Sequence, residues 1–306
     1  GMGDNFLAKF ESNGRLLWTK NIGRGESYQD NNIIEVDENN DLLLGIRYRD
    51  SVIINDNVID TLFYSGSSGS TASVVFKLDS AGNVYNEDFF NIKSDNRADI
   101  YDISTFSHDY YLSGRFNGTL DFNSNIINST SGSDDIFLLK TNNNLEDTWV
   151  RRTHGSSNDF PGSITTDEDL NVYLTGFFNS TDFQTDSTES IQSAVILNKG
   201  SRDLFIFKYN EDGNLQWARS YGTEQADWAR EVTQKQTILY ITGYSEGNIG
   251  FGNDTIYNQG GEDFFVGTFD IDGNKLRAFG LNQQGAGDES GRILDVAPDN
   301  TVYTGG

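Results

Sequence analysis

The sequence predicts an all-β fold, namely a β-propeller of five blades with four strands each. Three observations support this prediction. A sequence motif that contains Gly, Asp-x-Phe-x-x-Lys, Trp and Gly, in that order, recurs along the 306 residues. The segments within each copy are short and rich in Phe, Tyr, Ile, Val and Thr, as strands are. A sustained apolar pattern of helical period is absent.

The spacing of the repeat is seen most easily from its Lys residue. It falls at Lys9, Lys77, Lys140 and Lys208, with Thr268 in the fifth copy, so the copies lie 60 to 68 residues apart. Five copies fill the chain, and residues 1–306 are therefore expected to form one domain. Its blades are expected at about 31–91, 99–152, 160–221 and 229–280, with a fifth made from 291–306 and 3–22.

The strands of a blade follow one another in a fixed order. Residues 203–220 show the third and fourth strands, "DLFIFKY" and "LQWARS", separated by an Asp-Gly-Asn turn. A polar loop then leads to an inner strand, "REVTQ", and to the second strand of that blade, "ILYITG". The links at 51–60, 119–128 and 248–258 carry apolar residues around an Asn/Asp pair, which predicts projecting hairpins. The link at 179–199 is longer and less regular.

The order of strands also predicts how the ring closes. The sequence begins within a third strand and ends just after a second strand. Residues 4–20 and 292–305 would therefore pair in one shared blade, with the N-terminal strands beside the C-terminal ones. Such pairing removes the exposed edges that an open array would leave.

The repeat resembles a bacterial β-propeller repeat known as the SBBP repeat. The resemblance is carried by "DLFIFKY", "GNLQWARSYG" and "LYITG" within residues 203–243, and by residues 135–176, which end in "NVYLTG". It extends over essentially the whole chain. The resemblance implies a scaffold used in varied bacterial proteins that are secreted or displayed on the cell surface, and hence a location outside the cell, at its surface or in the periplasm.

Composition narrows the possible functions. The net charge of −24 and the isoelectric point near 4.2 disfavour nucleic acids and anionic membranes as partners. Because the chain has no cysteine, disulfides, thiolate nucleophiles and Cys-based zinc sites are excluded. No apolar run reaches the roughly 20 residues that a membrane-spanning helix needs.

Aspartates recur in the loop before each inner strand. On one face of a propeller they would form an acidic ring, for which turn formation and binding of Ca²⁺ or another ligand are the two interpretations. Aromatic side chains beside them could stack on sugars. The aspartates are Asp30, Asp99, Asp159, Asp227 and Asp288, and the aromatic residues are Tyr28, Phe160 and Trp228.

Carboxylates also occur along the predicted inner strands. If the neighbouring Ile, Val and Leu residues pack between blades, then Glu35, Asp102, Glu231 and Asp295 face the central channel. Like charges this close would raise each other's pKa or attract a cation such as Ca²⁺. A solvated acidic channel, a cation site and an acid–base pair remain as interpretations.

Two functions follow from these patterns. The first is a non-catalytic binding or scaffold module whose ligand is a glycan or another protein. The alternative is a glycoside hydrolase in which Glu35, Asp102, Glu231 and Asp295 supply the catalytic carboxylates. The uniformity of the five copies favours binding, because an active site on such a fold usually breaks the symmetry of the blades. The two histidines, His108 and His154, have no adjacent catalytic partner in the sequence.

Overall fold

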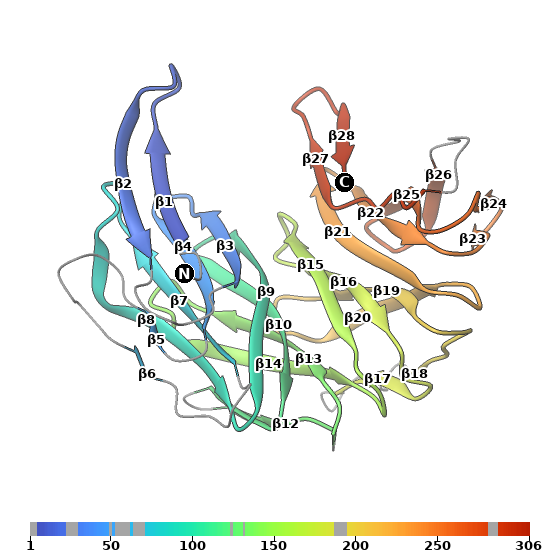
Figure 1. The fold of residues 1–306 in the computed structure, drawn as a ribbon, viewed down its shortest axis with the longest axis horizontal. Coiled ribbons are helices and arrows are strands. Elements are labelled where there is room, and N and C mark those ends of the chain that lie inside the picture. The colour runs from blue at the N-terminus through green and yellow to red at the C-terminus, as the bar shows by residue number, and fades with distance from the viewer. Residues whose placement is uncertain are drawn as a thin grey trace.

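The computed structural model describes residues 5–22, 30–48, 51–52, 62–63, 71–122, 125–130, 132–186, 195–280 and 287–306. Every regular element in these ranges is a β-strand, and the predicted all-β class is therefore confirmed (Figure 1). The strands form four antiparallel units of four strands, each in the order inner, second, third and outer. A two-stranded pair precedes the first unit, and another follows the last.

The bounds of the strands follow their sequence order. Unit 1 has β3 (Asp30–Val36), β4 (Leu42–Tyr48), β7 (Ala72–Leu78) and β8 (Val84–Ser94). Unit 2 has β9 (Arg97–Phe106), β10 (Asp109–Asn117), β13 (Asp135–Thr141) and β14 (Asp147–His154). Unit 3 has β15 (Phe160–Thr166), β16 (Val172–Phe178), β19 (Asp203–Tyr209) and β20 (Leu215–Tyr221). Unit 4 has β21 (Asp227–Lys235), β22 (Ile238–Ser245), β25 (Asp263–Asp270) and β26 (Lys275–Gly280). The N-terminal pair is β1 (Asn5–Phe10) with β2 (Leu16–Ile22), and the C-terminal pair is β27 (Ile293–Val296) with β28 (Val302–Gly305).

The links between second and third strands form hairpins, but two of them do not project. The hairpin β11 (Thr119–Phe122) and β12 (Asn125–Asn128) pairs with β8, the outer strand of the preceding unit. Likewise β17 (Phe183–Thr185) and β18 (Val195–Ile196) extend unit 2 from β14. The prediction of a projecting hairpin is therefore wrong for residues 119–128, because the outer strand β8 offers unpaired backbone groups that the hairpin satisfies.

The links in units 4 and 1 each form a two-stranded hairpin that is separate from the sheet of the unit. Unit 4 carries the hairpin β23 (Ile249–Phe251) and β24 (Asp254–Ile256) as a separate two-stranded sheet. In unit 1, β5 (Ser51–Val52) pairs with β6 (Leu62–Phe63), and the segment between them lies outside the described residues.

Neighbouring units are joined by the repeated Trp of the outer strand. The indole N–H of Trp149 donates to the carbonyl of Glu211 at 2.9 Å, and that of Trp217 donates to Ile271 at 3.1 Å. Both acceptors lie in the turn between the third and outer strands of the following unit. Trp18 reaches the carbonyl of Ser80 in unit 1 in the same way. These Trp residues therefore act as wedges between sheets.

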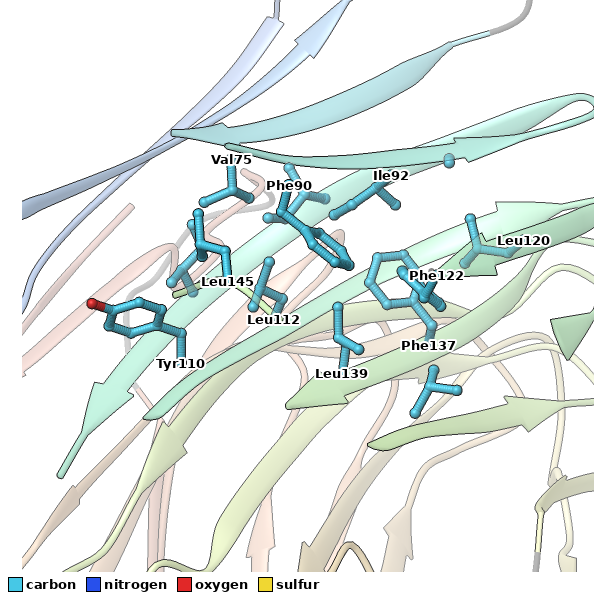
Figure 2. Close-up of a cluster of buried hydrophobic side chains, with 14 of the residues drawn as sticks. Val75, Phe90, Ile92, Tyr110, Leu112, Leu120, Phe122, Phe137, Leu139 and Leu145 are labelled. Atoms are coloured by element: carbon cyan, nitrogen blue, oxygen red, sulfur yellow. The ribbon is translucent and has the colours of Figure 1, made fainter. Parts of the chain in front are cut away.

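The apolar core lies between the faces of adjacent sheets. Figure 2 shows the cluster between units 1 and 2, in which Val75, Phe90, Leu112 and Phe137 are at most 2% exposed. The rings of Phe90 and Phe122 are stacked with their centroids 5.8 Å apart. Sheet-on-sheet burial of this kind holds the units in a row, since each unit covers an apolar face of the next.

The predicted closure is not present in this structure. The units follow an arc, and the N-terminal and C-terminal pairs lie at its two ends (Figure 1). Among the described strands β1 pairs with β2 alone, and β28 pairs with β27 alone. Each pair stays with the unit on which it packs: Trp18 holds the first to unit 1, and a bond from the Lys235 ammonium to the carbonyl of Val296 holds the second to unit 4.

Candidate functional site

Side chains of the inner strands bind the backbone of the next inner strand. A carboxylate oxygen of Asp102 on β9 accepts the N–H of Ile164 on β15 at 2.8 Å. The Oγ of Ser163 on β15 accepts the N–H of Val232 on β21 at 2.7 Å. These contacts hold successive inner strands side by side, so that corresponding positions come together at one end of them.

The inner strands carry a bulge at the same place. In β9 and β21, Tyr101 and Arg230 are extra residues within the pairing with the second strand. Gly162 lies in the matching irregularity of β15, and Arg292 precedes β27 at the corresponding position. A bulge turns a side chain out of the regular alternation of a strand and is common beside binding sites.

A pocket of about 500 Å³ lies at these bulges. Residues of β3, β9, β15 and β21, together with Arg292 just before β27, contribute to its wall. They are Ile33, Tyr101, Pro161, Gly162, Trp228, Arg230 and Arg292. Because this volume falls within the range of small-ligand sites, the pocket is the candidate functional site.

Two of the predicted sugar-stacking residues meet near this pocket. Phe160 stacks on Phe177 with the ring centroids 4.8 Å apart, and Trp228 meets the same Phe177 edge-on at 4.8 Å. Of the two, Trp228 lines the pocket, whereas Phe160 lies under the guanidinium of Arg115. The third predicted residue, Tyr28, lies outside the described residues. No pattern in the sequence singles out Phe177.

Two arginines in the pocket were also missed from the sequence. The guanidinium of Arg230 lies 4.0 Å from the ring centroid of Trp228. Burial, and then the charge of Arg292, lower the pKa of Arg230. The signal was present in "DWAREV" and "SGRILDV", where a basic residue adjoins an inner strand in a chain with 22 basic and 46 acidic residues.

The carboxylates predicted to line a central channel are partly brought together. Asp102 and Glu231 occupy corresponding positions beside the bulges of β9 and β21. Burial raises the pKa of Asp102 well above its usual range, and the charges of Glu231 and Glu35 raise it further. Burial likewise raises the pKa of Glu231 to about 7. Asp295, in contrast, is exposed and accepts the N–H of Val296 at 2.7 Å.

Glu35 belongs with Asp102 and Glu231 because its charge raises the pKa of Asp102. Burial raises the pKa of the Glu35 carboxyl, although the hydroxyl of Thr105 donates to it at 3.3 Å. Asp102 is also bound by two backbone N–H groups, those of Ile103 and Ile164. The arrangement thus combines a structural role for Asp102 with three carboxyls, those of Glu35, Asp102 and Glu231, whose pKa values are raised by burial.

The loop aspartates bind neighbouring backbone and hydroxyl groups. Asp159 accepts the N–H of Asn179 and the hydroxyl of Ser180, at 2.9 and 2.8 Å, and Asp227 accepts the N–H of Thr223 at 2.6 Å. Both are fully buried, and burial raises the pKa of Asp159 to about 7 and that of Asp227 to about 6. The contact of Asp227 lies within a local turn, whereas Asp159 joins two loops that are 20 residues apart in the sequence.

The other predicted metal ligands are arranged differently. The buried carboxylate of Asp99 binds Arg115 at 3.0 Å, and the exposed Asp288 accepts the N–H of Glu262. The side chain of Asp30 lies outside the described ones. Within the described part of the chain, no three His, Asp or Glu residues gather in a way that could hold a metal ion. Calcium binding stays a prediction.

Comparison with known proteins leaves the geometry as the main guide to function. No protein-family model matches this sequence, and no curated protein matches it. Across the described residues, no helix is long and apolar enough to span a bilayer.

Proposed function

We propose that the chain is a non-catalytic binding or scaffold module, a five-bladed β-propeller of the SBBP-repeat type from a bacterial cell-surface or secreted protein. Its ligand, a glycan or another protein, binds in the pocket at the bulges. The pocket itself supports this proposal. At corresponding positions of four inner strands the pocket holds Tyr101, Gly162, Arg230 and Arg292, whereas the Trp residues that pack the units are repeated. Variation at the pocket on a repeated framework is what specificity requires.

The proposed fifth blade combines the two pairs. In unit 3, Tyr173 of the second strand lies opposite Lys208, with its ring 6.0 Å from that of Trp217. Lys9 and Trp18 pair with each other in β1 and β2 as Lys208 and Trp217 do in unit 3. The N-terminal pair therefore has the third and outer strands of a blade and lacks the Tyr of a second strand.

The C-terminal pair has the missing element. Tyr303 of β28 corresponds to Tyr173 and is 63% exposed. A groove of about 280 Å³ beside β1 is lined by Lys9, Trp18, Ile34 and Leu42, among others. Tyr303 would lie in this groove opposite Lys9, which completes the blade and covers both edges.

A cross-link tests the closure. Pairing of Tyr303 with Lys9 places Thr304 opposite Ala8, within reach of a disulfide. The chain has no cysteine of its own, so the double variant Ala8→Cys/Thr304→Cys gives a clean readout. We expect an intramolecular disulfide under mild oxidation. Disulfide-linked dimers, or no cross-link at all, would contradict closure within one chain.

Binding is tested by screening immobilised glycans and bacterial envelope proteins with the purified chain. We expect a ligand that binds without being altered, and loss of binding in Trp228→Ala. The matched control is Tyr257→Ala, which removes an aromatic side chain that is 67% exposed and does not line the pocket. Equal loss in both variants would contradict the assignment of the pocket.

The second candidate is a glycoside hydrolase, which the raised pKa values of Asp102 and Glu231 favour. A carboxylic acid that stays protonated near neutral pH can act as a general acid beside an ionised partner. Release of reducing sugar by the chain, abolished in Glu231→Gln, would establish this function. Binding of the same glycan without release would exclude it.

A further inference from the structure

We propose that the pocket at the bulges binds a single carboxylate carried on a sugar, such as a uronic acid residue in an otherwise neutral glycan, through Arg230 and Arg292. This inference rests on the proposed binding function and specifies the ligand and its site. Four observations carry it: the unbalanced positive charge of the pocket, its fixed hydrogen-bond donors, the apolar part of its lining and the charge of the surrounding surface.

The positive charge of the pocket has no bound counter-charge. Arg115, on the neighbouring second strand β10, pairs with Asp99 at 3.0 Å and Asp134 at 3.5 Å. No such pair forms between a described carboxylate and Arg230 or Arg292, and Glu262 influences Arg230 from beyond ion-pair distance. Two guanidinium groups that lie close together repel each other, and a bound anion would relieve this repulsion.

The hydrogen-bond donors of Arg230 are held in place before a ligand arrives. Its guanidinium stacks on Trp228 at 4.0 Å and lies 5.2 Å from the ring centroid of Tyr244. The Nε of Arg230 and the Nε1 of Trp228 are buried and have no hydrogen-bond partner in the described part of the chain. Buried donors without acceptors are costly, and a carboxylate matches the planar fork of an arginine.

The rest of the lining suits a sugar ring. The half-buried Tyr101 and Ile33 offer some apolar surface beside the arginines, and the volume of about 500 Å³ accommodates a small ligand. An aromatic side chain such as that of Tyr101 can pack against the C–H face of a pyranose. A carboxylate at the arginines and a ring on the apolar side together describe an acidic sugar.

The surrounding charge argues for one carboxylate and against a polyanion. A chain with a net charge of −24 repels nucleic acids and densely charged polysaccharides at long range. A single carboxylate is repelled only weakly at long range, and at short range it is attracted by the two arginines. The ligand is therefore a glycan of low charge density.

The experiment measures the affinity for an oligosaccharide ending in glucuronic acid by calorimetry. It is compared with the glucose-terminated analogue, the glucuronate methyl ester and a 6-sulfated analogue. We expect the acid to bind at least tenfold more tightly than the neutral forms. Because hydrogen bonds to charged groups are strong, Arg230→Gln and Arg292→Gln are each expected to weaken binding about ten- to hundredfold.

Two further variants separate charge from folding. Arg277→Gln removes an exposed arginine from the outer strand of the same unit and should leave the affinity unchanged. Arg230→Lys keeps the charge without the planar fork and should bind at an intermediate affinity. If Arg230→Gln does not fold, as judged by its melting curve, the exposed Arg292→Gln decides the question.

The outcomes distinguish this inference from the function on which it rests. Equal affinity for acid and ester, or full affinity in both glutamine variants, overturns it and leaves glycan binding intact. Tighter binding of the sulfated sugar overturns the carboxylate and assigns the pocket to sulfated ligands. Absence of binding to every sugar, with a protein ligand found instead, overturns the inference and retains a binding module.

Discussion

The complete units and the terminal pairs share the same repeated sequence motif, yet corresponding side chains are buried to different extents in them. Phe137 and Phe205, the Phe of the repeat in units 2 and 3, are 0% exposed, whereas Phe6 in the N-terminal pair is 74% exposed. The second-strand residue Tyr173 is 0% exposed, and its counterpart Tyr303 is 63% exposed. The residue types hardly differ, so the difference comes from the neighbouring strands.

This difference shows what the second strand does for the third. In unit 3 the ring of Phe205 lies against Gly176 of the adjacent second strand. Phe6 has the same place in β1, where that second strand is absent from the sheet. An aromatic side chain left in water forgoes about 2–3 kcal/mol of burial free energy. Each pair therefore lacks the strands that the other has, which is the basis of the closure proposed above.

The largest expected effect tests whether Phe6 is buried in solution. Phe205→Ala should lower the free energy of unfolding by about 3–5 kcal/mol, as large-to-small changes in a core do. Because the proposed closure buries Phe6 equally, Phe6→Ala should cost about 3 kcal/mol. Urea unfolding followed by Trp fluorescence measures both. A cost under about 0.5 kcal/mol for Phe6→Ala would mean that this edge stays open.

The second prediction contrasts a carboxyl inside the row of units with one on the C-terminal pair. Glu231 has a folded pKa of about 7, above its unfolded value, so protonation favours the folded state. Its contribution is fully present at low pH and is lost as the pH rises through about 7. Glu231→Gln should therefore raise the stability at pH 8 by about 3 kcal/mol and leave it little changed at pH 4.

The control for this effect is Asp295→Asn, at an exposed carboxyl of β27. Exposed substitutions of this kind usually change stability by less than about 0.5 kcal/mol. Thermal melts of both variants between pH 4 and pH 8 provide the measurement. If the stability of Glu231→Gln depends on pH as that of the parent chain does, the pKa of Glu231 is not raised. The proposal that Glu231 acts as a general acid then has no support.

The fold could be predicted from the sequence as far as local chemistry determines it. The turn between third and outer strands is encoded by residues such as Asp270 and Gly273, since Asp270 accepts the N–H of Asn274 and Gly273 has a φ of 78°. The Trp wedges follow from repetition alone. What each hairpin pairs with could not be predicted, because the free edge of β8 that receives β11 belongs to another unit.

The candidate site could be predicted only in part for the same reason. Asp102 and Glu231 follow from the alternation of an inner strand. Tyr101 and Arg230 do not, because they are displaced by bulges that arise in pairing with β10 and β22. Alternation read along the sequence places a bulged residue on the wrong face, and the pocket was therefore missed.

The smallest expected effect compares the same turn in a complete unit and in the N-terminal pair. Gly273 and Gly14 both have positive φ, so an added Cβ costs about 1 kcal/mol at either position. At Gly273 the Cβ would also lie 2.9 Å from Trp217, whereas no described atom lies within 4 Å of the Cβ at Gly14. Gly273→Ala should therefore cost about 2–3 kcal/mol, because the indole must move.

Gly132→Ala, at a φ of 85° with no described atom near the added Cβ, measures the backbone strain alone. In the closed ring the turn at Gly14 would meet β26, where Arg277 and not Trp lies opposite Thr268. Since the flexible Arg277 can move aside more easily than an indole, Gly14→Ala should cost only slightly more than Gly132→Ala. If Gly14→Ala costs no more than Gly132→Ala, nothing packs on this turn, and the ring is then open at the junction of the two pairs.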